Sequence, residues 1–250
     1  MKISATIICM NESEHIAACI RSLLPVADEI IVLDSGSTDD TVFQAEKLGA
    51  KVFHQPFLGH IDQKNKAVSL ASHPYILSLD ADEELSSGLQ QSILRVKQQH
   101  SAQAYSMNRL NNFCGQWIKH TGWYPDRKLR LWHRDSGAWG GTNPHDKVVL
   151  QKGVITHHLS GDILHFTYQS EAGFDLQSDK FARIAGEAMY KQGKNPGIIP
   201  PIWRAVFRFI RDYLFKQGFR DGRAGFIISR GNARYTYLKY ALLHQLNAKR

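Results

Sequence analysis

Four short apolar runs alternate with polar, helix-compatible segments over the first 80 residues of this 250-residue chain. Each run is short enough for one buried strand, and the segments between them carry helix N-caps and amphipathic spacing. Strands that alternate with helices form a parallel sheet covered on both faces. The expected strands cover residues 3–9, 29–34, 51–54 and 75–79, and the expected helices cover residues 16–24, 41–48 and 62–72. The first half is therefore predicted to be an α/β sheet of nucleotide-binding type.

The fourth run ends in four carboxylates within five residues, Asp80, Asp82, Glu83 and Glu84. In an extended segment Asp80 and Asp82 project to the same side, about 6.6 Å apart at ~3.3 Å per residue. Ligands of open α/β sheets bind at the carboxyl ends of the strands. Two carboxylates there could hold Mg²⁺ or Mn²⁺, and the cation could carry a diphosphate. The alternative is that these acids cap a helix beginning near Ser86, since short acidic motifs recur by chance.

The second run also ends in an acid, Asp34, followed by a loop with one glycine and several helix N-caps. A carboxylate at this position can accept hydrogen bonds from a ribose or from the N–H of a base. It could equally be a turn or cap residue. The chain has neither a Gly-x-Gly-x-x-Gly motif nor a Walker lysine loop, which argues against a dinucleotide dehydrogenase and a P-loop ATPase.

Composition restricts the class of protein further. With 43% hydrophobic residues the chain can bury a sizeable core, and a formal charge of +8 indicates an anionic partner: nucleic acid, an acidic membrane surface or a phosphorylated substrate. The three scattered cysteines fit reduced thiols better than disulfides or a zinc site. No apolar run reaches the ~18 residues of a membrane span, and the N-terminus does not resemble a signal peptide. We therefore expect a cytoplasmic location.

Four short motifs in a fixed order carry a resemblance to a known family. They are Asn11-Glu12 after the first strand, Val-Leu-Asp-Ser-Gly-Ser-Thr-Asp-Asp-Thr at residues 32–41, Gln-Lys-Asn-Lys-Ala at residues 63–67, and Leu-Asp-Ala-Asp-Glu at residues 79–83. Together they resemble the inverting family 2 glycosyltransferases, which have the GT-A fold. The resemblance covers about the first hundred residues, and each motif is weak on its own.

The resemblance implies roles for individual residues. Asp34 would bind the uracil of a UDP-sugar, Asp80 the ribose region, and Asp82 the metal on the donor diphosphate. Lys64 would approach the nucleotide, although a solvated lysine on a helix is a comparable alternative. The nucleotide-sugar site implied by these motifs consists of Asn11, Glu12, Asp34, Lys64, Asp80 and Ala81.

An aromatic and basic region begins near residue 101. The aromatic residues are Trp117, Trp123, Tyr124, Trp132 and Trp139, and the interleaved cations are Lys119, Arg127, Lys128, Arg130 and Arg134. Residues 128–134 alternate, which predicts a strand with a basic face. Such a region could stack nucleic-acid bases, form a sugar platform that clamps acceptor phosphates, or pack the edge of the sheet. Arg130, Trp132 and His145 are the candidate acceptor contacts.

A second motif of chemical interest covers residues 140–148 and contains the pair His145-Asp146. In the resembling family the corresponding acid, more often Glu, is the catalytic base, which makes Asp146 the candidate. An inverting transfer needs one carboxylate to accept the proton of the acceptor hydroxyl, and the metal stabilises the leaving diphosphate. The alternative is a surface acid paired with Lys147 or Arg130. His157, His158 and His165 follow, and of these only His165 is considered as a third metal ligand, outside the main prediction.

The C-terminal third is predicted to be helical. In the segment 198–216, Arg204, Arg208 and Arg211 fall on one stripe beside a broad apolar face. A basic stripe beside aromatic residues is typical of a helix that lies in an anionic membrane interface. The alternative is a helix packed on the catalytic domain with its arginines in water. Residues 215–226 and the following helix are similar to the C-terminal part of bacterial enzymes that glycosylate the lipopolysaccharide inner core.

These inferences combine into one prediction. Residues 1–168 form a GT-A catalytic domain, with a nucleotide-sugar half (1–100) and an acceptor half (101–168), and residues 169–250 form a helical, basic and aromatic extension for membrane attachment. The resemblance implies metal-dependent, inverting transfer from a UDP-sugar, expected to be UDP-glucose, to a phosphorylated, lipid-anchored heptose of the lipopolysaccharide core in the bacterial cell envelope. The enzyme would act as a peripheral protein on the inner face of the cytoplasmic membrane.

Two alternatives remain open at this point. One is a family 2 transferase with a different acceptor, such as a polysaccharide, a teichoic-acid-like polymer or a protein side chain. The other is a nucleic-acid-binding protein without enzymatic activity. We expect no nucleic-acid partner, because Asp34, Asp80, Asp82 and Asp146 would repel a phosphate backbone.

Overall fold

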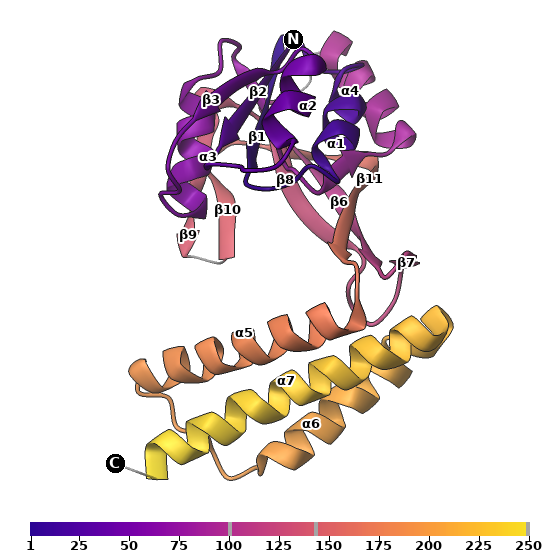
Figure 1. Ribbon diagram of the computed structural model, residues 1–250. Helices are drawn as coiled ribbons and strands as arrows, with labels where there is room; N and C mark the ends of the chain where they lie inside the picture. Colours follow the sequence, from indigo (N-terminus) through magenta and orange to yellow (C-terminus); the bar gives the residue numbers. More distant parts are fainter. Residues whose placement is uncertain (100–101, 143–144, 249–250) are drawn as a thin grey trace. The chain divides into compact units, whose positions relative to one another are not determined.

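The computed structural model describes residues 1–99, 102–142 and 145–248 (Figure 1). The chain forms two compact units. The first consists of Met1–Arg109 and Asp126–His165, and the second of Leu110–Pro125 and Phe166–Arg250. The strands β6 (Ala104–Phe113) and β11 (Thr156–Tyr168) each begin in the first unit and end in the second.

The first unit is built on a mixed sheet whose strands follow the order β3-β2-β1-β4-β8-β6-β11-β5. Its parallel part contains β1 (Ile3–Cys9), β2 (Glu29–Asp34), β3 (Lys51–His54) and β4 (Tyr75–Asp80). The helices α1 (Ile16–Leu23), α2 (Thr41–Lys47) and α3 (His60–Ser69) connect these strands. The predicted alternation of strands and helices is thus confirmed. Cys9 pairs with Asp34 and Ile8 with Asp80, so both acids lie at the same edge of the sheet.

Burial on both faces explains the apolar runs. Ile3, Ala5 and Ile7 of β1 are fully buried, and β2 is buried along its whole length. On one side they pack with Ile20 of α1, whose apolar residues recur at helical spacing. A central parallel strand has no exposed face, which is why its sequence shows no alternation of apolar and polar residues.

The second half of this unit consists of the elements that follow β4 in the sequence. The short β5 (Glu83–Leu85) pairs antiparallel with β11, and α4 (Ser87–Gln99) follows it. Gly161 of β11 has a φ of +100°, and a Cβ there would lie 2.3 Å from the backbone nitrogen of Leu89. Only glycine permits this close approach between β11 and the start of α4. The remaining strands of the unit are β8 (Asp126–His133), which pairs with β4, and the two-stranded sheet of β9 (Gly137–Thr142) and β10 (His145–Leu150).

The second unit is mainly helical. Its long helices are α5 (Glu171–Lys191), α6 (Pro201–Ile210) and α7 (Gly222–Ala248), and a π-helical turn over Arg211–Phe215 and a 3₁₀ turn over Gly218–Asp221 join α6 to α7. Three ion pairs link α5 to α7: Glu171 with Arg223, Asp175 with Arg230, and Asp179 with Arg234. Within the described residues, none of these helices is long and apolar enough to span a membrane.

The segment Leu110–Pro125 belongs to this helical unit, whereas the sequence placed all of residues 1–168 in one catalytic domain. The segment contains β7 (Gln116–Ile118), which pairs with the end of β6. Asp221, 5% exposed, accepts hydrogen bonds from the backbone N–H of His120 at 2.8 Å and pairs with the His120 ring at 2.7 Å. Phe113 packs against Phe174 of α5 with ring centroids 5.3 Å apart. These contacts are long-range in sequence and could not be inferred from local patterns.

Candidate active site

The Asp34 carboxylate holds the loop that follows β2. It is 1% exposed and accepts hydrogen bonds from the backbone N–H of Gly36 at 2.9 Å and of Ser37 at 3.1 Å, and it lies 3.2 Å from Nδ1 of His54. Burial acts to raise the pKa of Asp34, but the hydrogen bonds from Ser37, Gly36 and His54 lower it below its ordinary value. This arrangement matches the turn alternative. Binding of a base by Asp34 stays a prediction.

Asn11 and Glu12 connect the end of β1 to the same loop. The Asn11 side chain accepts a hydrogen bond from the backbone N–H of Thr38 at 2.8 Å, and the backbone N–H of Glu12 donates to Thr41 Oγ1 at 2.8 Å. Burial and the nearby Asp82 raise the pKa of the Glu12 carboxyl to about 7, with Asp39 and Asp80 adding to the effect. The edge of the sheet therefore carries a concentration of negative charge that favours a cationic ligand.

Asp80 lies between two cations. Lys64 Nζ is 2.8 Å from Asp80 Oδ1, and Arg130 Nη2 donates to Asp80 Oδ2 at 3.0 Å and to Glu83 Oε1 at 2.9 Å. Removal from water acts to raise the pKa of Asp80, but Arg130 and Lys64 hold it well below its usual range. The Lys64 and Arg130 side chains are each 5% exposed, so the solvated-lysine alternative for Lys64 is wrong.

Lys64 also contacts the candidate base. Its Nζ donates to Asp146 Oδ2 at 2.7 Å, which joins α3 to β10 across 82 residues of sequence. The indole of Trp139, 6% exposed, supports both cations, with Lys64 Nζ 4.3 Å and the Arg130 guanidinium 5.3 Å from its ring centroid. The alternative partners of Asp146, Lys147 and Arg130, are not the ones that the structure shows. Lys64 thus brings Asp80 and Asp146 to one place.

Asp82 lies beside His165. The distance between Asp82 Oδ2 and His165 Nε2 is 3.2 Å, and the two side chains are 31% and 13% exposed. β11 pairs with β5 in a register that sets His165 opposite Glu83. A carboxylate and an imidazole fit a divalent cation that takes its other ligands from phosphate and water. Among the described residues there is no group of three or more His, Cys, Asp or Glu arranged to hold a metal by themselves.

Several features of the site escaped the sequence analysis. Glu83 is fully buried and accepts hydrogen bonds from Arg130 and, at 3.0 Å, from the backbone N–H of Asp80. Through these two contacts it helps to position Asp80. Trp139 was named in the aromatic region, but its contacts with Lys64 and Arg130 were not predicted. Ala81, by contrast, was predicted: it is 4% exposed and lies between β4 and β5, and its contact with the nucleotide-sugar stays a prediction. The run of four acids was the only available signal for Glu83.

Trp132 is wrongly predicted as an acceptor contact. Its side chain is fully buried, packs on Trp139 with ring centroids 6.1 Å apart, and donates from Nε1 to the Gly137 carbonyl at 3.1 Å. It forms part of the sheet's packing, which was one of the alternatives. Arg130 is also buried and holds Asp80 and Glu83. The backbone of His145 lies in β10, but its side chain lies outside the described part of the chain.

Arg204, Arg208 and Arg211 lie in the helical unit and do not form a free stripe. Arg208 Nε is 2.6 Å and Arg211 Nη2 is 2.8 Å from the carboxylate of Asp212, which is fully buried. Arg204 donates to the backbone carbonyls of Ile199 and Pro196. The three arginines have the predicted helical spacing. Two of them form ion pairs with Asp212, which the sequence analysis did not predict.

In this α/β fold, acids and buried cations converge at the carboxyl edge of the sheet. The chain belongs to the family described as glycosyl transferase family 2, whose model matches residues 4–158. The protein is therefore a glycosyltransferase with the GT-A type of α/β fold, followed by a helical region, as predicted. This assignment disfavours the nucleic-acid-binding alternative.

Individual relatives extend over most of the chain. A glycosyltransferase of Rickettsia typhi, itself uncharacterized, is 31% identical over 99% of this chain and 88% of its own length. The lipopolysaccharide core biosynthesis glycosyltransferase LpsC of Rhizobium meliloti is 26% identical over 99% of this chain and 94% of its own length. Among solved structures, glucosyl-3-phosphoglycerate synthase from Mycobacterium tuberculosis, in complex with Mn²⁺, UDP and glucosyl-3-phosphoglycerate, is 26% identical over 44% of each chain, with a TM-score of 0.36.

Proposed function

We propose that this glycosyltransferase moves a sugar, glucose in the first instance, from a UDP-sugar to a saccharide acceptor with inversion at the anomeric carbon. The observation that carries the proposal is the position of Lys64, whose ammonium group contacts Asp80 of β4 and Asp146 of β10. It sets the candidate base beside the acidic edge of the nucleotide-binding sheet. One residue thereby connects the expected donor site with the expected proton acceptor.

The donor diphosphate would bind at the Asp82 end of this edge. Asp82 and His165 are the residues that would hold Mg²⁺ or Mn²⁺, because their carboxylate and imidazole lie 3.2 Å apart and both are partly exposed. A cation held there supplies charge neutralisation for the leaving UDP. The protein's own cations, Lys64 and Arg130, are paired with carboxylates and hold Asp80 in place. The Asp34 and Asn11 loop would receive the uridine.

Asp146 would act as the general base. Its carboxylate accepts the proton from the acceptor hydroxyl while that oxygen attacks the anomeric carbon, and UDP leaves from the opposite face of the sugar. Lys64, held against Trp139, orients the carboxylate. A positioned base of this kind accounts for about 10²–10⁴ in rate. Inversion requires only this one carboxylate.

As the acceptor we propose a heptose of the lipopolysaccharide inner core, lipid-anchored and phosphorylated. Support comes from the relationship to LpsC, which extends through the helical C-terminal region. The formal charge of +8 suits an acceptor that carries phosphate and a membrane surface that carries anionic lipid. We therefore propose peripheral attachment to the inner face of the cytoplasmic membrane.

Binding of a panel of UDP- and GDP-sugars, with Mg²⁺ or Mn²⁺ and then with EDTA, tests this function. We expect one UDP-sugar to bind in the presence of metal, and we expect this binding to be lost when EDTA is added. Transfer of that sugar to lipopolysaccharide core acceptors, with and without their phosphates, then tests the acceptor. Binding of GDP-sugars alone, or equal binding in EDTA, would contradict the proposed donor site.

A further inference from the structure

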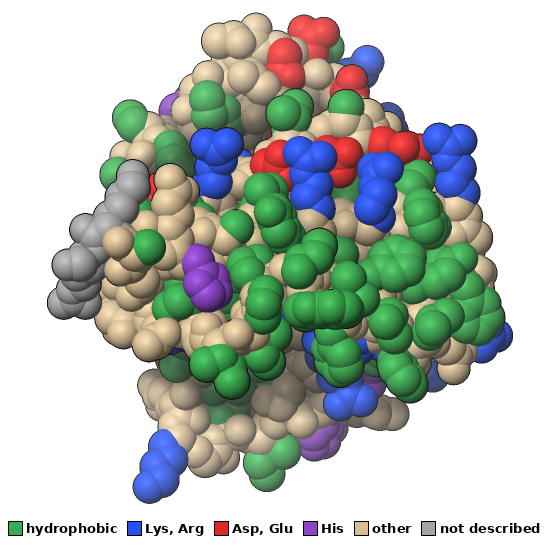
Figure 2. All heavy atoms as spheres, turned by 90° about the horizontal axis from the view of Figure 1, so that it is seen from below, with side chains coloured by type: hydrophobic (Ala, Val, Ile, Leu, Met, Phe, Trp, Pro, Cys, Tyr) green, Lys and Arg blue, Asp and Glu red, His purple; other side chains and the backbone are tan. Residues whose placement is uncertain are grey.

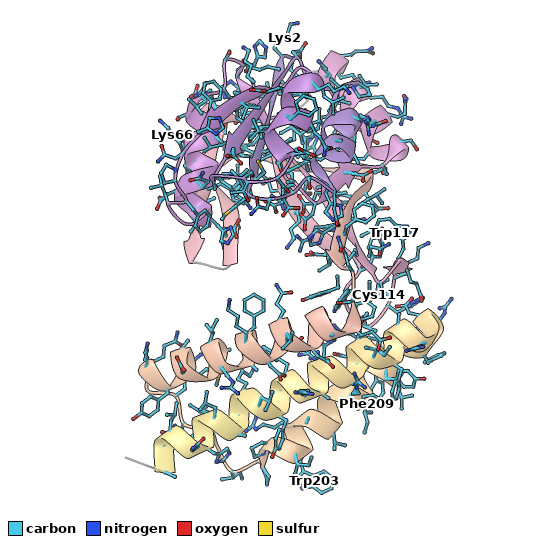
Figure 3. The ribbon with its side chains drawn as sticks, viewed as in Figure 1. Lys2, Lys66, Cys114, Trp117, Trp203 and Phe209 are labelled. Atoms are coloured by element: carbon cyan, nitrogen blue, oxygen red, sulfur yellow. The ribbon has the colours of Figure 1, made fainter. Side chains whose placement is uncertain are left out.

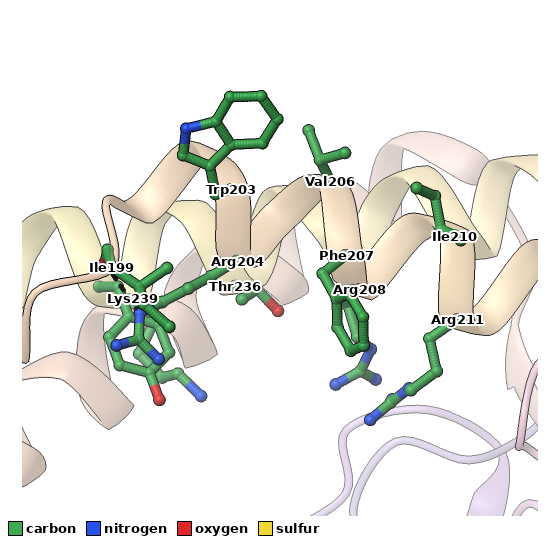
Figure 4. A pocket seen from close by; sticks show the side chains of 11 residues that line it. Ile199, Trp203, Arg204, Val206, Phe207, Arg208, Ile210, Arg211, Thr236 and Lys239 are labelled. Carbon is green, nitrogen blue, oxygen red and sulfur yellow. Dashed lines mark hydrogen bonds between the residues drawn. The ribbon is translucent and has the colours of Figure 1, made fainter.

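A groove of about 680 Å³ runs between α6 and α7 in the helical unit (Figure 4). Its wall on α6 includes Trp203, Arg204 and Phe207, and its wall on α7 includes Lys239 and Tyr240. The two helices are joined beneath it by aromatic packing, with the ring centroids of Phe209 and Phe226 5.7 Å apart. Both walls of the groove therefore belong to the helical unit.

Positive charge in the groove is only partly neutralised. Arg208 and Arg211 point toward Asp212 and are ion-paired with it. Arg204 lies over the ring of Tyr240 at 4.3 Å and donates to backbone carbonyls, and no carboxylate among the described residues forms an ion pair with it. Lys239 contacts the rings of Tyr235 and Tyr240, and no carboxylate in the described part of the chain forms an ion pair with it.

The surroundings of Lys239 confirm a local excess of cations. Burial lowers the pKa of Lys239, and the neighbouring Arg208, Arg204 and Lys194 lower it further. A group in this position gains from an anion, because the anion would offset both the repulsion among the cations and the loss of water. The planar guanidinium of Arg204 and the point charge of Lys239 both suit a phosphate.

Large apolar side chains border the same groove. Trp203 is 64% and Phe207 is 67% exposed. Figure 3 shows Trp203 projecting outward from α6, whereas Phe209 lies toward α7. Figure 2 shows hydrophobic side chains gathered into a broad area, bordered on one side by Lys and Arg side chains that alternate with Asp and Glu. An exposed apolar area of this kind is typical of a surface that contacts another protein, a membrane or a ligand.

We propose that the groove between α6 and α7 binds the phosphate of an anionic membrane lipid, with Lys239 and Arg204 on the phosphate and Trp203 and Phe207 among the acyl chains. This inference rests on the proposed membrane attachment and names the residues that perform it. It replaces the predicted arginine stripe with one arginine of α6 and one lysine of α7. The helix α6, with exposed aromatic residues and cations beside them, has the composition of a helix that lies in a membrane interface.

A lipid fits the groove better than a second copy of the chain. In a two-fold symmetric dimer each surface meets its own equivalent, so Lys239 and Arg204 would face the same cations of the partner. A free phosphate would satisfy the charge but would leave Trp203 and Phe207 in water. Only a molecule with a phosphate and apolar chains satisfies both parts of the surface.

Sedimentation of the full chain with vesicles tests the proposal. We expect binding to vesicles of phosphatidylglycerol and phosphatidylcholine but not to phosphatidylcholine alone. Lys239→Gln should weaken this binding about fivefold, the effect of one cation near an anionic surface, and Trp203→Ser should weaken it independently. Lys180→Gln, which removes an exposed lysine of α5 away from the groove, is the matched control and should leave it unchanged.

Four outcomes would overturn the inference. These are equal effects of the Lys239 and Lys180 changes, equal binding to both kinds of vesicle, vesicle binding that Trp203→Ser leaves unchanged, and a dimer in solution that Phe207→Ser dissociates. Metal-dependent UDP binding of the unmodified protein, measured without vesicles, tests the proposed function separately. Loss of lipid selectivity with intact UDP binding would contradict the lipid site alone.

Discussion

The ammonium group of Lys64 lies 2.7 Å from the carboxylate of Asp146 and 2.8 Å from that of Asp80. The three residues come from α3, β10 and β4, which are far apart in the sequence. With a side chain only 5% exposed, Lys64 neutralises two acids that would otherwise repel each other at the end of the sheet. The site is therefore organised around a cation that belongs to the protein.

Replacement of Lys64 by Met should lower both stability and turnover. Removing one partner of a buried ion pair costs about 3–5 kcal/mol, and the partial exposure of Asp80 and Asp146 places this change at the lower end. The melting temperature and the transfer rate measure the two effects. Lys66→Met, on an exposed position of the same helix, is the matched control. If both variants melt alike, Lys64 does not hold the two acids.

Replacement of Asp146 by Asn should remove turnover while preserving donor binding. The amide keeps the size of the side chain but cannot accept the proton, so the transfer rate should fall by about 10²–10⁴. Titration with the UDP-sugar should give an affinity close to that of the unmodified protein. An active variant would show that another group takes the proton and that Asp146 only pairs with Lys64.

Replacement of Asp82 by Asn should abolish the metal dependence of UDP binding, because the carboxylate charge is the main attraction for a hard cation. His165→Ala should raise the Mn²⁺ concentration needed for half-maximal UDP binding, without abolishing it at saturating metal. Calorimetric titration of Mn²⁺ in the presence of UDP measures both. His157→Ala, on the same strand, should behave like the unmodified protein. Unchanged metal dependence in the Asp82 variant would exclude this residue as the ligand.

The sequence predicted the part of the site that local patterns encode. Buried parallel strands have continuous apolar runs, so the positions of Asp34 and Asp80 at strand ends could be read directly. The resemblance to family 2 supplied Asp146. Its contact with Lys64 could not be predicted, because it depends on how β10 approaches α3. The same is true of His165, which reaches Asp82 through the register of β11 on β5.

Two predictions were wrong for different physical reasons. Alternation in residues 128–134 correctly predicted the strand β8, but Arg130, Leu131 and Trp132 are all buried because β8 lies between β4 and β6. Alternation identifies two faces and does not say whether either meets water. In the helical unit the predicted spacing of the arginines was correct. The sequence analysis did not consider Asp212, one residue after Arg211, which neutralises Arg208 and Arg211.

Acid should destabilise the protein partly through Glu29, which lies at the opposite end of β2 from Asp34. Burial acts to raise the pKa of Glu29, but hydrogen bonds from Lys51, Ser4 and Ser72 lower it to about 2. The unfolded state therefore binds the proton more readily, and this contribution to stability is present above about pH 4.5 and is lost as the pH falls toward 2.

Replacement of Glu29 by Gln should accordingly reduce the free energy of unfolding by roughly 2–3 kcal/mol at pH 7, the scale set by a shift of this size. The difference from the unmodified protein should shrink as the pH is lowered, because protonated Glu29 loses the same ion pair with Lys51, whose Nζ lies 2.7 Å from the carboxylate. Urea unfolding of both proteins at several pH values measures it. A difference that stays constant with pH would mean that Glu29 acts through its hydrogen bonds to Ser4 and Ser72 and not through its charge.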